Sequence, residues 1–282
     1  MSLTTFYLFL KGQSMKKIFI VFATLVFCTV SVFAHPYEAF NIVMSRNPGW
    51  FGSEFEGTLD DSLARKRLDE FAKNVGQAIG GGAFGSSAGL DTFGFNLSAK
   101  MSYQQVTSDD VITNRNGDGG IYYPIVQGEF LLSEYLTGVA RISYSNDSFL
   151  FGGGFKYRLN DGYGYIPTVS IQSIYNYLVT DADDPYRVFT GYDRVKFNAW
   201  NLKNAVIAFF PEVPYFNPYV FVSYDVTGLH AITSERHGSS SIISGAGYGA
   251  GGTISLEPIN LGFSISMYDG NPNYNFGVLF GF

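Results

Sequence analysis

Six charged residues lie in segments where nearly every second residue is apolar: Lys100, Glu129, Arg141, Lys156, Arg158 and Lys203. Because side chains alternate between the two faces of a β-strand, all six are predicted on the polar face of a sheet. They could form an internal network of salt bridges and hydrogen bonds. They could instead form a basic constriction that favours anions. We favour the network, with Glu129 and Arg141 on a diagonal across neighbouring strands.

Catalytic chemistry has few candidates. The sequence holds three histidines, and His230 and His237 are close in sequence to Asp225 and to a run of serines. A general base must reach its proton within hydrogen-bond distance, so this group is a conceivable hydrolase site at the outer rim. No pair of acids accompanies the histidines, and we expect no catalytic residue and no enzyme.

Metal and cofactor signals are weak. The stretch 114–119 begins like a calcium loop, but its twelfth position is Ile125 where such a loop has Glu. Asn, Asp and Gly there are explained by turn formation. We expect no metal site and no cofactor.

The composition favours strands. The 282 residues include 27 Phe, 20 Tyr and 33 Gly, which is unusual for a soluble domain. Aromatic residues favour strands, and glycines mark turns and crowded interior positions. The formal net charge is -6, which argues against nucleic acid as a partner, because phosphate binding requires clustered Lys and Arg.

Ten alternating segments have about the length that a tilted strand needs to cross a bilayer. They are 93–104, 121–132, 136–145, 148–159, 166–178, 196–210, 216–225, 244–256, 259–268 and 274–282. Lipid cannot hydrogen-bond an open sheet edge, so the sheet must close. We therefore predict an all-β, antiparallel, up-and-down transmembrane barrel of about ten strands, with eight or twelve as alternatives.

The alternation also predicts which residues face lipid. In segment 148–159 the outward positions include Phe149, Phe151 and Phe155. Segment 196–210 is ambiguous, and we place Trp200 outward because this hides Lys203. The long connections 105–120, 179–194 and 226–243 are assigned to the outer side. The short ones, 133–135, 160–165, 211–215 and 257–258, are assigned to the periplasmic side.

Both chain ends indicate the outer membrane. The C-terminal strand resembles the recognition signal of outer-membrane barrels at Asn275, Gly277, Phe280 and Phe282, which implies the barrel-assembly machinery as a partner. At the other end a charged start at 15–17 and an apolar run at 18–33 predict an export signal cleaved after Ala34. Residues 1–34 are then an upstream extension and signal peptide. The barrel would contact membrane lipid and lipopolysaccharide.

Residues 35–91 precede the barrel of 92–282. Within them Leu68, Phe71, Val75 and Ile79 recur at helical spacing, and glycines at 80–82 end a helix predicted over about 60–79. We favour a helix packed on the periplasmic rim. The alternative is a plug inside the lumen, argued from inward glycines at 152, 154, 245, 247, 249 and 251. A plug would bring Asp69 or Glu70 to the lumen cations.

The stretch 68–79, followed by 92–95, resembles uncharacterised outer-membrane barrel families in which a short amphipathic helix and a Gly-rich link precede the first strand. The resemblance implies a fold and a membrane, and no catalytic residue. Our first functional hypothesis is a narrow pore or solute-uptake protein with a basic lumen. The alternative is a closed barrel that acts through its surface loops as an adhesin, antigen or envelope-stabilising protein. A hydrolase at the outer rim ranks last.

Overall fold

The computed structural model describes residues 62–83, 94–106, 110, 119–145, 148–162, 165–180, 195–210, 215–233, 237–256 and 259–281. In these ranges the chain forms one helix, α5 (Ser62–Gly80), and eleven strands. The strands are β1 (Phe95–Gln105), β2 (Gly120–Leu131), β3 (Leu136–Ser145), β4 (Ser148–Arg158), β5 (Thr168–Thr180), β6 (Val195–Phe209), β7 (Phe216–Thr233), β8 (His237–Ser239), β9 (Ile243–Leu256), β10 (Ile259–Tyr268) and β11 (Asn271–Gly281). Among the described residues, no helix is both long enough and apolar enough to cross a membrane.

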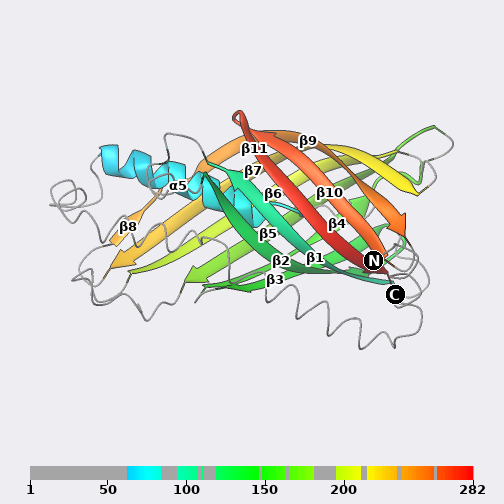
Figure 1. Ribbon diagram of the computed structural model, residues 1–282, viewed down its shortest axis with the longest axis horizontal. Helices are drawn as coiled ribbons and strands as arrows, with labels where there is room; N and C mark the ends of the chain where they lie inside the picture. The colour runs from blue at the N-terminus through cyan, green and yellow to red at the C-terminus, as the bar shows by residue number, and fades with distance from the viewer. Residues whose placement is uncertain are drawn as a thin grey trace, which may run out of the picture. The chain divides into compact units, whose positions relative to one another are not determined.

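Ten long strands close into a barrel (Figure 1). Each long strand pairs antiparallel with the next long strand along the chain, and β1 pairs with β11 to complete the ring. The three-residue β8 pairs only with the end of β7. This confirms the predicted up-and-down barrel and the count of ten, and eight or twelve strands are excluded.

The outer face of the barrel is apolar and the inner face is mixed. Phe149, Phe151 and Phe155 on β4 are 44–48% exposed. Leu150, which lies between the first two, is fully buried and points into the barrel. On β6, Lys203 is 2% exposed while Val206 faces outward, so the chosen phase of that strand is confirmed. The outer surface therefore presents aromatic and aliphatic groups, as lipid contact requires.

The connection predicted at 226–243 is wrong in extent. β7 continues to Thr233 and pairs with the first half of β6, with Val195 opposite Thr233. The apolar alternation fails at Gly228, which hid this continuation from the pattern. Gly228 is needed there because a Cβ atom would lie 2.6 Å from the Trp200 indole nitrogen across the strand pair. The long β6 thus keeps a hydrogen-bonded partner along its whole length.

The helix lies inside the barrel, so the prediction of a helix on the periplasmic rim is wrong and the plug is correct. Phe71, Val75 and Ile79 are fully buried in one cluster with wall residues such as Leu150 and Phe197. The Phe71 and Phe197 rings meet edge to face, 5.7 Å apart. These wall residues lie at the strand ends next to the connections predicted to be long, and Figure 1 shows α5 entering at that end, near β8.

The apolar lining of this end explains the position of the helix. Inward positions there carry the aliphatic and aromatic side chains Val106, Ile121, Tyr123, Leu150, Leu178, Phe197 and Leu229. Such a lumen would hold water poorly, whereas the apolar side of α5 fills it. The predicted helix bounds of about 60–79 agree with the observed 62–80.

The plug was predicted from inward glycines that would leave room for a helix, but three of these glycines on β9 leave room for other side chains instead. On β9, a Cβ at Gly247 would lie 2.2 Å from the Tyr268 ring, and one at Gly249 would lie 2.5 Å from the Phe221 ring. One at Gly251 would lie 2.6 Å from the Tyr219 ring. These glycines therefore make room for large side chains of the neighbouring strands β7 and β10.

We expect Gly249→Ala to destabilise the barrel by about 1–3 kcal/mol, because the new methyl group overlaps both the Phe221 ring and a strand carbonyl. Gly245→Ala is the matched control, since nothing lies within 4 Å of a Cβ placed there. Urea unfolding in lipid vesicles, followed by tryptophan fluorescence, measures both. Equal midpoints for the two variants would contradict this packing.

Candidate functional site

A row of polar side chains crosses the lumen at mid-depth. Six inward positions, one on each of the strands β1 to β6, are paired from each strand to the next. They are Ser98, Gln127, Arg141, Gly152, Asn176 and Asn201. All except Gly152 are buried. We call this row and its neighbours Lys100 and Gln172 the polar belt. It lies beyond the apolar zone that the helix fills.

The C-terminal end of α5 rests on the polar belt. Arg141 Nη1 donates to the carbonyl oxygen of Ile79 at 3.0 Å and to Asn176 Oδ1 at 2.8 Å. Its second terminal nitrogen donates to the carbonyl oxygen of Gly81. The last carbonyls of a helix have no partner within the helix and carry its partial negative charge. The buried Arg141 guanidinium supplies these carbonyls with both hydrogen-bond donors and a positive charge.

Two further carbonyls after the helix are held in the same way. Lys100 Nζ donates to the carbonyl oxygen of Gly82 at 2.8 Å. Gln172 Nε2 donates to that of Ala83 at 2.9 Å, and Gln127 Nε2 contributes a longer contact of 3.4 Å. The carbonyls of Ile79, Gly81, Gly82 and Ala83 therefore accept hydrogen bonds from four side chains, and we call residues 79–83 the carbonyl turn.

The glycines of the carbonyl turn allow this close approach. A Cβ at Gly81 would lie 2.0 Å from Ser102 Oγ, and Gly82 has a φ of +59°, which side chains disfavour. One helical turn earlier, a Cβ at Gly76 would lie 2.3 Å from the Thr227 side chain. Residues 80–82 thus do more than end the helix, because they bring its backbone against the barrel wall.

A second charged cluster lies on β6, β7 and β10. Lys203 Nζ lies 3.2 Å from Asp225 Oδ1 and also hydrogen-bonds Tyr268 OH. Ser223 Oγ is 2.8 Å from Tyr268 OH. Both charged side chains are almost fully buried. Asp225 and not Asp69 or Glu70 is therefore the acid opposite this lumen cation.

We expect Lys203→Met or Asp225→Leu alone to cost about 3–5 kcal/mol of barrel stability, because each leaves one buried charge without its partner. The double variant should recover much of that loss. The Arg158–Asp161 pair, with side chains 33% and 62% exposed, is the control, and breaking it should cost less than about 1 kcal/mol. The urea midpoints of the two single variants, the double variant and the control variant measure these losses. Additive losses in the double variant would contradict a coupled pair.

The remaining predicted lumen residues lie nearer the short-turn end. Glu129 and Arg141 do occupy diagonal positions, since Glu129 pairs with Val139 and Gln127 with Arg141. The ionic partner of Glu129 is nevertheless Lys156, at 3.8 Å. Arg158 lies at the rim, where it donates to the carbonyl oxygen of Glu134. The six residues therefore divide among separate contacts and form no single ring.

The acids predicted to enter the lumen with the plug stay at its entrance. Asp69 Oδ1 accepts a hydrogen bond from the backbone nitrogen of Ser241 at 2.6 Å. Lys73 forms a salt bridge of 2.8 Å with Asp269 in the β10–β11 turn. These two contacts hold the entering half of the helix to the connections above it.

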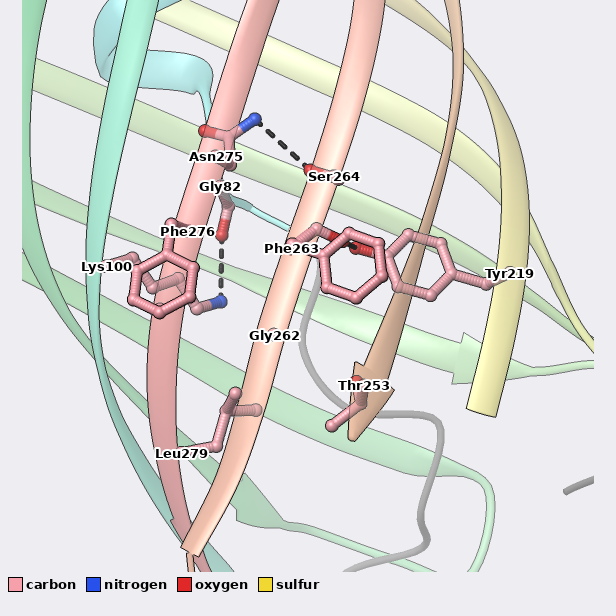
Figure 2. Close-up of a pocket in the computed structure, with 11 residues that line it drawn as sticks. Gly82, Lys100, Tyr219, Thr253, Gly262, Phe263, Ser264, Asn275, Phe276 and Leu279 are labelled. Carbon is pink, nitrogen blue, oxygen red and sulfur yellow. Dashed lines mark hydrogen bonds between the residues drawn. The ribbon is translucent and has the colours of Figure 1, made fainter. Parts of the chain in front are cut away.

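A small cavity lies beside the carbonyl turn (Figure 2). Its volume of about 20 Å³ has room for roughly one water molecule. Figure 2 shows Lys100 bonded to Gly82 on one side and Asn275 bonded to Ser264 on the other. Asn275 Oδ1 is buried and has no hydrogen-bond partner among the described residues.

Asp225 is not placed to serve as the acid of a hydrolase site at the outer rim. It faces inward with Ser223 and Thr227, whereas His230 has the opposite parity on β7. The side chain of His237 lies outside the described residues, as do the stretch 114–118 and the predicted cleavage site Ala34. Among the residues that the structure describes, no group of three potential ligands could hold a metal ion.

The predicted assembly signal is in part described. Asn275 and Gly277 face inward and Phe280 lies on the outward parity of β11, while Phe282 is outside the described residues. Its role in assembly stays a prediction.

Sequence reasoning missed Asp225, Ser223 and Tyr268 as lumen residues. Parity along β7 was a usable signal for the first two, because they alternate with the apolar residues Val222 and Tyr224. No signal pointed to the backbone carbonyls of residues 79–83.

No protein-family model matches this sequence, and no curated protein matches it. Several solved structures are similar. The translocator domain of the autotransporter NalP from Neisseria meningitidis is 12% identical over 69% of this chain and 91% of that one, with a TM-score of 0.38. Ail, the attachment invasion locus protein of Yersinia pestis, is 11% identical over 67% and 97%, with a TM-score of 0.36. An outer membrane channel from Pseudomonas putida F1 is 7% identical over 71% and 100%, with a TM-score of 0.37. Similarity this low carries no argument about function, and the fold rests on the strand pairing of this chain.

Proposed function

We propose that this protein is an integral outer-membrane β-barrel that is closed at rest by its own helix and passes small solutes when the helix moves. The closed ring of strands and its apolar outer face support a place in a lipid bilayer. The export signal predicted at the N-terminus and the terminal strand support the outer membrane.

The resting state is closed for an energetic reason. Leu68, Phe71, Val75 and Ile79 are buried between helix and wall. At about 1.5–3 kcal/mol for each side chain, withdrawal of the helix costs about 6–12 kcal/mol. Since each 1.4 kcal/mol is a factor of ten, fewer than about one molecule in 10⁴ would be open without a trigger.

One observation carries the gated-pore proposal. Arg141, Lys100 and Gln172 of the polar belt all donate to backbone carbonyls of a single segment that precedes the barrel, and Arg141 donates in addition to Asn176 of the wall. Removal of that segment would uncover a basic, amide-lined lumen without breaking a strand pair. A lumen of this character favours anions.

The second candidate is a permanently closed barrel that acts through its surface as an adhesin, antigen or envelope-stabilising protein. The observation that favours it is the apolar contact of α5 with the long-loop end, which resembles a protein core. A core of this kind suits a contact that never opens.

Planar-bilayer conductance in urea separates the two candidates. We expect no current from the folded protein without urea. Below the urea concentration that unfolds the strands, we expect reversible channel openings, because the short helix unfolds separately from the closed sheet. Circular dichroism in the same urea monitors the strands. Absence of current at every urea concentration with intact strands would exclude the gated pore and leave the closed barrel.

A further inference from the structure

We propose that the polar belt is a binding site for small carboxylate solutes, and that such a solute opens the plug by taking the donors that now hold the carbonyl turn. This inference rests on the proposed gated pore and adds its ligand class and its trigger.

The geometry of Arg141 is the first argument. Its two terminal nitrogens each donate to a different oxygen, the carbonyls of Ile79 and Gly81. A guanidinium binds a carboxylate through two N–H donors that meet two oxygens. The carbonyl turn therefore occupies the two terminal nitrogens of Arg141 that a carboxylate would use.

The neutrality of the acceptors around Arg141 is the second argument. Arg141 is 1% exposed and donates to three neutral acceptors, which are two backbone carbonyls and the Asn176 side chain. A carboxylate would add the attraction between opposite charges to these hydrogen bonds, and that attraction is stronger in a buried site of low dielectric than in water. A carboxylate at this position would therefore satisfy the buried guanidinium better than the carbonyl turn does.

The surrounding donors extend the site beyond one carboxylate. Lys100 Nζ and Gln172 Nε2 hold the next two carbonyls, those of Gly82 and Ala83. A second oxygen-bearing group on the same solute could use them, so the favoured ligand is a small dicarboxylate or hydroxycarboxylate. The solute must displace residues 79–83 to bind, and binding and opening are thereby coupled.

The cavity beside Gly82 gives a solute its first contact. It borders the Lys100–Gly82 hydrogen bond, and its other polar side chains come from Tyr219, Thr253, Ser264 and Asn275 (Figure 2). A carboxylate oxygen entering there would compete first for Lys100. Loss of the Lys100 bond would leave the carbonyl turn held by Arg141, Gln172 and Gln127.

The test uses succinate as the probe and two independent readouts on the full chain in a Cys28→Ser background. The first is channel open probability, recorded in the low urea concentration at which openings first become measurable. The second is the rate at which a maleimide labels Ala78→Cys, a fully buried helix position that should react only when the helix moves. At a succinate concentration ten times its dissociation constant for the open form, both readouts should rise about tenfold. Open molecules with succinate bound would then outnumber open molecules without it by about ten to one.

The controls define the ligand class. Neutral succinamide should change neither readout, and inorganic phosphate should act much more weakly than succinate. Arg141→Lys keeps a cation but loses the two-nitrogen fork, so the ratio of labelling with and without succinate should fall towards one. Lys156→Met, which removes a lumen cation paired with Glu129, should keep the ratio near ten.

The outcomes are distinct. Equal effects of phosphate and succinate, or an effect of succinamide, would overturn the carboxylate assignment. No effect of succinate on a protein that urea does open would overturn the inference and leave the gated pore standing. If urea opens nothing either, the proposed function fails together with the inference.

Discussion

Replacing Phe71 with alanine should convert a silent barrel into one that conducts. The ring is fully buried between helix and wall and packs edge to face on Phe197. Loss of a buried Phe ring costs about 3–5 kcal/mol, and here that loss falls on the closed position of the helix. The open population should therefore grow by about two to four powers of ten. Single-channel recording in planar bilayers without urea measures the change.

Phe221→Ala is the matched control for this prediction. It removes a ring of the same size from a separate lumen cluster of β6 and β7 side chains. That variant should lose comparable stability against urea and remain silent, because its ring does not belong to the cluster that holds the helix. Current of similar frequency from both variants would mean that general loosening of the barrel, and not withdrawal of α5, opens the path.

A disulfide between helix and wall should abolish that current. Gly80 and Asn201 suit the pair, because a Cβ at Gly80 would lie 3.1 Å from Asn201 Cγ, where a cysteine sulfur would stand. Gly80 is not among the glycines with positive φ, so its backbone accepts a side chain. In a background with Phe71→Ala and Cys28→Ser, Gly80→Cys with Asn201→Cys should conduct when reduced and be silent when oxidised. Reduction should restore the current fully.

The two single cysteine variants control for the substitutions themselves. Each should conduct in the same background whether oxidised or reduced, because neither can tie the helix to β6. Persistent current through the oxidised double variant, with the disulfide verified by mass spectrometry, would show that ions bypass the helix. Absence of current from the reduced double variant would support the permanently closed barrel.

Alternation along single strands was enough to predict most of the barrel. The period of two is a local property, so it identified the outward Phe149 and the inward Arg141 without knowledge of any partner. It failed where a local residue breaks the pattern for a distant reason. Gly228 did so in β7, because it accommodates the Trp200 ring from the neighbouring strand.

The sequence alone also determined the helix and its apolar side, and it predicted the buried cations. It could not determine where the helix lies, because an amphipathic helix suits a rim or an apolar lumen equally well. Only the tertiary structure paired the apolar side of α5 with the apolar end of the lumen. The contact that gives the site its chemistry joins Arg141 to backbone carbonyls 60 or more residues away. Backbone carbonyls are the same in every residue, so no pattern of side chains along the chain can reveal which of them a buried guanidinium will bind.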